Sequence, residues 1–231
     1  TGPAVALGAY LLGSLPVLYL IGRLRGYDLR GKDQHITLWR RVGRAEGSLG
    51  VAWDIGKGAL VVVVARKLGL PASWVALAGL AVVIGQMWPF LLWDLGEKGN
   101  STGLGMALAL SPQATALALV PALIGAAWRT LPRLWRASSW NERLRLGGPP
   151  SRSLPLGVIC GFILLPIASA RLGDDSAVGW VFLALLAAIL VRRLTAGLTR
   201  DEVRRDRSAL INRLLYDRSH FRPGPEAEET A

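Results

Sequence analysis

A polar segment at residues 94–102 interrupts the apolar sequence, and its residue types suit phosphate chemistry. It reads DLGEKGNST and leads into an apolar run. Glycines beside Lys98 at a helix start would direct backbone N–H groups and positive potential toward one point, as a phosphate requires. The alternative is an ordinary turn between helices. The spacing excludes a Walker loop. Ser101 fits the G-x-S-x-G pattern of a nucleophile elbow, but that motif requires a β-sheet, which this sequence does not predict. We therefore interpret Ser101 as a helix cap or a phosphate contact.

Asp54 and Lys57 are charged residues within the otherwise apolar stretch 48–66. Three residues apart on a helix, they share a face and can pair. Each would cost roughly 2.5 to 3.5 kcal/mol at the centre of an isolated membrane span, so we expect both to face other helices or an interface. They form either an ion pair that fixes helix packing or a substrate-facing pair. Gly56 and Gly58 would allow close approach of a helix or a ligand.

The basic loop after the first apolar run contains Asp28, Arg30 and Arg40. Arginines beside a membrane entrance can bind phosphate in a bidentate manner, and the alternative is a solvated basic loop. His35 lies in the same loop, and His220 in the tail is the only other histidine. We therefore predict no metal site.

The composition predicts a membrane protein. The 231 residues are 52% hydrophobic and carry a net charge of +11, and the two characters are separated along the chain. Long apolar runs alternate with arginine-rich connections, which is typical of membrane proteins. The single cysteine, Cys160, excludes an internal disulfide and a thiolate metal cluster.

The fold class that we predict is all-α, a polytopic transmembrane helix bundle with about seven hydrophobic segments. A helix needs roughly 20 residues to cross the hydrocarbon core, although shielded segments are shorter. The first run has no basic residue before it and is predicted as a span rather than a signal peptide. The predicted segments are 3–22, 48–66, 73–93, 101–110, 112–127, 154–171 and 177–191.

The distribution of basic residues predicts the orientation. Residues 101–127 form either one long span or a hairpin broken at Ser111 and Pro112. Loop 23–47 has seven Lys or Arg, 129–152 has six and 192–222 has nine. Only the hairpin puts all three in the cytoplasm, with the N-terminus outside and the C-terminus inside. We therefore predict a multi-pass protein of the bacterial inner membrane.

The predicted domain organisation is a transmembrane domain at 1–200, with a basic insertion at about 129–152, and a basic then acidic cytoplasmic tail at 201–231. The insertion alternates arginine with leucine and tryptophan. This pattern suits a helix at an anionic lipid surface, and the alternative is a disordered basic linker.

The motifs, taken in order, resemble the bacterial acyl-phosphate:glycerol-3-phosphate acyltransferases. The matching stretches are GAYLLGSLP at 8–16, YLI at 19–21, DLR at 28–30, DIGKGAL at 54–60, GQMWP at 85–89, GEKG at 96–99 and RLTAG at 193–197. The chain also departs from the family pattern. A shorter loop, GKDQHIT at 31–37, replaces a Ser- and Asn-containing stretch. Gln86 stands where the family has His, and Glu97 where it has Gly. The family's His, Asn and Glu would fall near Ala187, Leu190 and Thr199.

The resemblance implies acyl transfer from an acyl phosphate to the sn-1 hydroxyl of glycerol 3-phosphate, on the cytoplasmic face. It implies catalytic roles for Lys98 and Arg40. The implied substrate-binding residues are Asp28, Arg30, Gly96, Gly99, Arg193, Asp54 and Lys57. We expect membrane lipids as partners, no cofactor and no nucleic acid, and the sequence leaves the oligomeric state open. Two alternatives remain: a non-catalytic relative that binds phosphorylated lipid, and a small transporter that uses Asp54 and Lys57.

Overall fold

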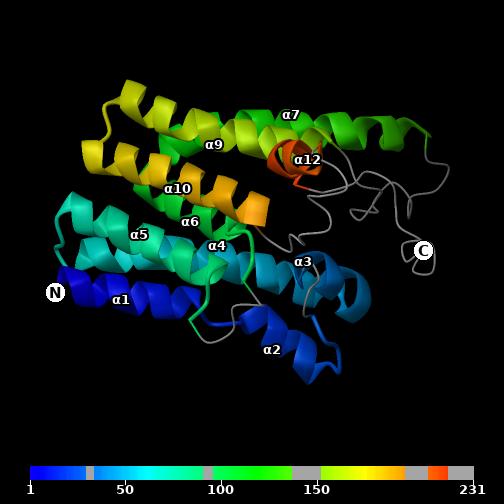
Figure 1. Cartoon of the computed structure of the whole chain (residues 1–231), viewed down its shortest axis with the longest axis horizontal. Helices are drawn as coiled ribbons and strands as arrows, with labels where there is room; N and C mark the ends of the chain where they lie inside the picture. The colour runs from blue at the N-terminus through cyan, green and yellow to red at the C-terminus, as the bar shows by residue number, and fades with distance from the viewer. Residues whose placement is uncertain (30–33, 91–95, 137–151, 196–207, 218–231) are drawn as a thin grey trace. The chain divides into compact units, whose positions relative to one another are not determined.

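The computed structural model describes residues 1–29, 34–90, 96–136, 152–195 and 208–217, and all regular secondary structure in these ranges is helical (Figure 1). The all-α prediction is therefore confirmed for the described residues. The chain divides into two compact units. The first comprises Thr1–Ala118 and Phe162–Ile189, and the second comprises Leu119–Gly161 and Leu190–Ala231.

The first predicted span is broken in the middle. Helix α1 covers Gly2–Gly13 and helix α2 covers Val17–Leu24, where we expected one helix over 3–22. Pro16 explains the break, because a proline disfavours helical conformation in the residue before it and lacks an N–H. After the gap at 30–33 come the short helix α3 (Gln34–Thr37) and a π-helix, η1 (Leu38–Val42).

Helices α4 (Arg44–Lys67), α5 (Ala72–Met87) and α6 (Asn100–Leu110) form the centre of the first unit. α5 ends earlier than the predicted 93, because Pro89 follows. Helix α1 packs along α5, and α4 packs along α6 (Figure 1). A Cβ on Gly58 would collide with the backbone oxygen of Thr102, and one on Gly105 with that of Ile55. Glycine thus brings the backbones of α4 and α6 together.

Gly56 does not take part in this close approach, contrary to our expectation. A Cβ added there would meet no atom within 4 Å. The reason is helical geometry: Gly56 lies two residues from Gly58 and therefore points away from the face that meets α6.

Helix α7 (Pro112–Arg136) starts directly after α6, which confirms the predicted break at Ser111 and Pro112. It continues beyond the predicted end at 127, into the basic insertion, of which residues 137–151 lie outside the described part. The remaining helices are α9 (Ser153–Leu172), α10 (Ser176–Thr195) and α12 (Ser208–Tyr216). In the second unit, α7 and α9 also approach closely through glycine, because Gly157 abuts the backbone oxygen of Pro121.

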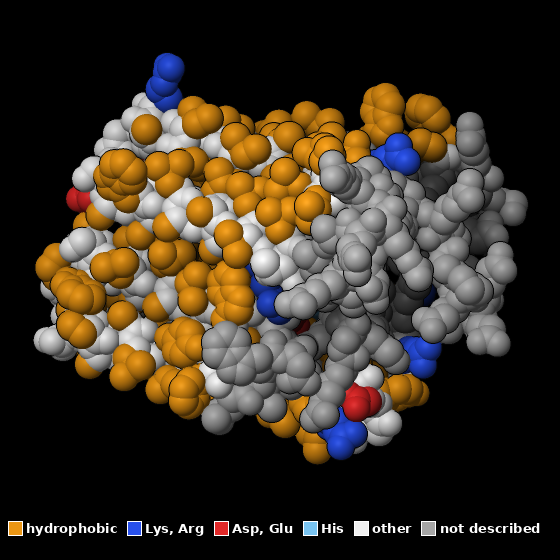
Figure 2. Space-filling model, viewed as in Figure 1, with side chains coloured by type: hydrophobic (Ala, Val, Ile, Leu, Met, Phe, Trp, Pro, Cys, Tyr) orange, Lys and Arg blue, Asp and Glu red, His pale blue; other side chains and the backbone are white. Residues whose placement is uncertain are grey.

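The outer surfaces of these helices are apolar. Five of the described helical segments are long and apolar enough to cross a membrane, and α5 is a shorter apolar helix. Apolar side chains predominate on the visible face of the molecule (Figure 2), and Leu7, Leu123 and Trp180 are more than half exposed. Such exposure suits contact with lipid. The chain is a multi-pass membrane protein, while the number of crossings and the orientation stay predictions.

Candidate functional site

A buried ion pair in α4 forms the base of the site. Asp54 is 0% exposed and Lys57 is 3% exposed. Lys57 Nζ lies 2.7 Å from Asp54 Oδ1, one helical turn away. The predicted pairing of these two residues is therefore confirmed. Burial of either charge is tolerable only because the partner is present.

The second carboxylate oxygen of Asp54 meets residues from two other elements. Gln86 Nε2, in the last turn of α5, donates to Asp54 Oδ2 at 2.7 Å. His35 Nε2, in α3, lies 3.0 Å from the same oxygen. The cluster therefore joins α3 and α5 to α4.

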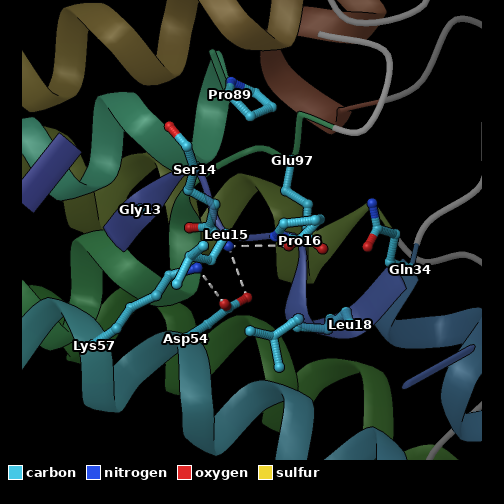
Figure 3. Close-up of a pocket in the computed structure, with 12 residues that line it drawn as sticks. Gly13, Ser14, Leu15, Pro16, Leu18, Gln34, Asp54, Lys57, Pro89 and Glu97 are labelled. Carbon is cyan, nitrogen blue, oxygen red and sulfur yellow. Dashed lines mark hydrogen bonds and ion pairs between the residues drawn. The ribbon is translucent and has the colours of Figure 1, made fainter. Parts of the chain in front are cut away.

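Glu97 completes the cluster from the segment before α6. Its Oε2 lies 3.0 Å from His35 Nε2 and 3.1 Å from Gln86 Nε2. Its backbone N–H also donates to the backbone oxygen of Gln86, at 3.1 Å. In Figure 3, Asp54 and Glu97 point into the same space, beside Pro16. We call His35, Asp54, Lys57, Gln86 and Glu97 the polar cluster.

The loop before α6 has the conformation that its glycines predict. Gly99 has a φ of 74°, in the left-handed region, and directly precedes the first residue of α6. A Cβ at this position would also collide with Met87. Only glycine fits well here, since other residues rarely adopt this conformation. Gly96, Glu97 and Lys98 lie in the same short segment, and Lys98 is half-buried.

The electrostatics of the polar cluster favour a protonated His35. Burial by itself lowers the pKa of His35, but the hydrogen bonds to Asp54 and Glu97 outweigh it and raise the pKa to about 10. Burial raises the pKa of Glu97, and His35 offsets this only in part. With His35 protonated and both carboxylates ionised, two positive and two negative charges cancel. The cluster alone therefore supplies no net charge to attract a phosphate.

A pocket lies directly beside the cluster and holds about 290 Å³ of space, part of it open to solvent. Figure 3 shows Ser14, Pro16 and Glu97 around it. It is lined by Gly13, Ser14, Leu15, Pro16, Val17, Leu18, Gln34, Asp54, Lys57, Gln86, Pro89 and Glu97. The break between α1 and α2 thus forms one wall, and carboxylate, ammonium and amide groups form another.

The structure brings some of the predicted site residues together. Gly96, Lys98 and Gly99 adjoin Glu97 in sequence, and Glu97 contacts the cluster that contains Asp54 and Lys57. Asp28 is exposed, at the end of the segment after α2. Arg30 and the side chain of Arg40 lie outside the described part of the chain.

Arg193 belongs to the second unit. It is 2% exposed, and its Nη1 donates to the backbone oxygen of Leu214 at 3.1 Å. Its Nη2 donates to the backbone oxygen of Pro155 at 3.4 Å. These bonds connect α10 with α9 and α12.

Sequence reasoning did not select His35, Gln86 or Glu97 as site residues. The available signal was that all three stand at places where the chain departs from the family pattern. Considered singly, each departure is a loss of a family residue. Together they complete one cluster: Gln86 supplies an amide donor, His35 an imidazole, and Glu97 the second carboxylate.

Comparison with known protein sequences gives one family. The model of the family described as glycerol-3-phosphate acyltransferase matches residues 3–200. A glycerol-3-phosphate acyltransferase of Trichlorobacter lovleyi is 43% identical over 127 residues, which is 53% of this chain and 66% of that protein. Glycerol-3-phosphate acyltransferase 4 of Dehalococcoides mccartyi is 29% identical over 90% of this chain and 85% of its own length. This chain covers between 56% and 66% of the first curated relatives it matches.

Comparison with solved structures gives the same family. The crystal structure of PlsY (YgiH), an integral membrane glycerol 3-phosphate acyltransferase, in its glycerol 3-phosphate form, is 26% identical to this chain. The match covers 98% of each chain with a TM-score of 0.68. This chain and that structure therefore share a fold.

Proposed function

We propose, since this chain belongs to the glycerol-3-phosphate acyltransferase family, that it transfers a fatty acyl group from an acyl phosphate to the sn-1 hydroxyl of glycerol 3-phosphate. The products are lysophosphatidic acid and inorganic phosphate. The observation that carries the proposal is the likeness, over nearly the full length, to a structure described as the glycerol 3-phosphate form of such an enzyme.

The reaction makes modest demands on the protein. The hydroxyl oxygen of glycerol 3-phosphate attacks the acyl carbon, the bond from that carbon to the phosphate oxygen breaks, and the hydroxyl proton passes to a phosphate oxygen. Phosphate leaves readily, so the protein has mainly to align two phosphorylated substrates and neutralise their charge. A substrate phosphate acting as the base makes a side-chain base unnecessary.

The loop before α6 is the proposed binding site of the acyl-phosphate group. Lys98 supplies positive charge, and Gly96 and Gly99 let the backbone approach the phosphate. Support comes from the left-handed Gly99 at the start of α6, where no side chain caps the helix and the helix dipole is positive. Asp54 and Lys57 are proposed to contact substrate from the adjoining pocket.

The arginines are the proposed ligands of glycerol 3-phosphate or of the leaving phosphate. They are Arg30 and Arg40 in the basic loop and Arg193 in α10, and Asp28 is proposed to help to orient the acceptor. Apolar helix faces would hold the acyl chain. The charge of the connecting loops supports a cytoplasmic site in a bacterial inner membrane, with residues 1–200 as the acyltransferase domain and 201–231 as a tail.

The test is an assay of the purified protein in detergent with palmitoyl phosphate. Phosphate release and lysophosphatidic acid formation are measured with and without glycerol 3-phosphate. We expect release that requires the acceptor, and a decrease of about 100-fold or more in Lys98→Ala, as for loss of a group that stabilises developing charge. Lys67→Ala is the matched control, because Lys67 is exposed at the end of α4.

A specific observation favours a second candidate function. The family's His and Asn positions fall near Ala187 and Leu190 in this chain. If folded protein forms no lysophosphatidic acid but binds palmitoyl phosphate, and Lys98→Ala weakens that binding, the chain is a non-catalytic binding relative. If folded protein neither forms lysophosphatidic acid nor binds palmitoyl phosphate, both proposals are wrong.

A further inference from the structure

Four side-chain nitrogen and oxygen atoms of the polar cluster form a closed ring. Going around it, His35 Nε2 lies 3.0 Å from Asp54 Oδ2, which lies 2.7 Å from Gln86 Nε2. Gln86 Nε2 lies 3.1 Å from Glu97 Oε2, which lies 3.0 Å from His35 Nε2. We propose that this ring is the binding site of one divalent metal cation, held by His35, Asp54, Glu97 and the amide of Gln86.

The size of the ring fits a coordination shell. Around a cation with metal–ligand bonds of about 2.1 Å, neighbouring ligands at right angles lie about 3.0 Å apart. The edges of the ring, 2.7 to 3.1 Å, are close to that value. The donor atoms of His35, Asp54 and Glu97 also lie within 4.8 Å of one another. A cation at the centre therefore reaches all four groups with small side-chain adjustments.

Gln86 provides an independent indication of a ligand. It is only 6% exposed, and its Oε1 has no hydrogen-bond partner among the described residues. A buried amide oxygen without a partner is energetically costly. The nitrogen and oxygen of an amide occupy equivalent positions, so a half-turn of the group exchanges them. With a cation in the ring, this turn makes Oε1 a ligand, and Nε2 takes the outer position that Oε1 leaves.

The surroundings suit a cation as well. Lys57 contacts Asp54 through Oδ1, so Oδ2 can bind metal while Lys57 orients the carboxylate from the outside. The side chains of His35 and Glu97 are 23% and 15% exposed, which leaves a way in from the pocket. An imidazole together with oxygen ligands suits first-row ions such as Mn²⁺ and Zn²⁺.

Metal binding would change the charge of the cluster. Without metal, Asp54, Glu97, Lys57 and a protonated His35 sum to zero. A divalent cation displaces the imidazole proton, and the sum becomes +1. Glu97 directly precedes Lys98, so the loaded cluster would add positive charge beside the loop that we propose for phosphate. The sequence predicted no metal site because it has only two histidines, which lie far apart, and the carboxylates of this ring come from distant residues of the chain.

The experiment uses the full-length protein in detergent, stripped with EDTA and dialysed against metal-free buffer. Mn²⁺ is titrated in, and free Mn²⁺ is followed by electron paramagnetic resonance. We expect one bound Mn²⁺ per chain, with electron spin echo modulation from the imidazole ¹⁴N. We expect Glu97→Gln to weaken binding about 10-fold or more, and His35→Ala to remove the ¹⁴N signal. Zn²⁺ should compete for the same site.

Glu46→Gln is the matched control, since Glu46 pairs with the exposed Arg25 outside the cluster. If His35→Ala does not fold, Glu97→Gln decides, because it keeps the shape of the side chain. The proposal is overturned if neither Mn²⁺ nor Zn²⁺ is retained, or if retention is equal in wild type, Glu97→Gln and Glu46→Gln. These results do not depend on acyl transfer, so they leave the proposed function untouched.

Discussion

The two units each bury a cation, and they stabilise it in different ways. Lys57 in the first unit lies 2.7 Å from the carboxylate of Asp54. Arg193 in the second unit donates to the neutral backbone oxygens of Leu214 and Pro155. Asp217 adds a coulombic attraction to Arg193.

The partners of Lys57 and Arg193 differ in how far they neutralise the positive charge. A carboxylate in direct contact cancels the charge of Lys57, whereas a carbonyl oxygen contributes only a dipole. Removal of Asp54 would therefore leave the buried charge of Lys57 without its direct partner, while removal of Arg193 would leave two carbonyl groups without this donor. Four predictions test this comparison, in order of decreasing effect.

Asp54→Ala should cause the largest loss of stability. It leaves Lys57 buried without its partner, and we expect a loss of about 3–5 kcal/mol in the free energy of unfolding. The measurement is unfolding in detergent micelles by SDS titration. The double variant Asp54→Leu with Lys57→Met removes both charges and should recover part of the loss, because Gln86 and His35 still lack their contact with Asp54 Oδ2. A loss in Asp54→Ala below about 1 kcal/mol, the scale of an exposed pair, would contradict buried pairing.

Gly105→Ala should disturb the packing of α4 against α6, which helps to position the polar cluster. The new Cβ collides with the backbone of Ile55, so α4 and α6 must separate, at a cost of about 1–3 kcal/mol. Gly157→Ala tests the same device in the second unit, against Pro121. Gly56→Ala is the control, because its Cβ enters open space and alanine favours a helix by up to about 1 kcal/mol. Equal effects of Gly105→Ala and Gly56→Ala would show that close packing is unimportant.

Arg193→Met should cost less than Asp54→Ala. It leaves the backbone oxygens of Leu214 and Pro155 without this donor, and we expect a loss of about 1–3 kcal/mol. Arg193→Lys should recover part of it, since lysine can donate to one of the two oxygens. The same SDS titration ranks the variants. A loss larger than that of Asp54→Ala would reverse the comparison.

Arg25→Ala should have the smallest effect. Arg25 Nη2 lies 2.8 Å from Glu46 Oε1, but the arginine side chain is 61% exposed. Water and salt screen such a pair, so we expect a change below about 1 kcal/mol. Glu46→Gln should change the free energy of unfolding by a similarly small amount, and both changes should become smaller at high salt. A large, salt-independent loss would mean that this pair resembles Asp54 and Lys57.

Local sequence determined much of the fold, because the positions and breaks of helices depend mainly on residues that are neighbours in the chain. Hydropathy predicted the positions of the long apolar helices, since membrane helices must satisfy their backbone internally. The spacing of Asp54 and Lys57 predicted their pairing, because three residues make nearly one helical turn. Pro112 predicted the break before α7. Pro16 breaks the first apolar run in the same manner, but the hydropathy of residues 3–22 is continuous and gave no sign of the break.

The assembly of the polar cluster depends on tertiary packing. Gln86 and Asp54 are 32 residues apart in the chain, and their contact depends on how α5 packs against α4. That packing follows from the shapes of many side chains and from glycine contacts such as the one between Gly58 and Thr102. No local pattern encodes such distances. The sequence therefore determined that His35, Gln86 and Glu97 depart from the family pattern, and the fold decided that they meet at Asp54.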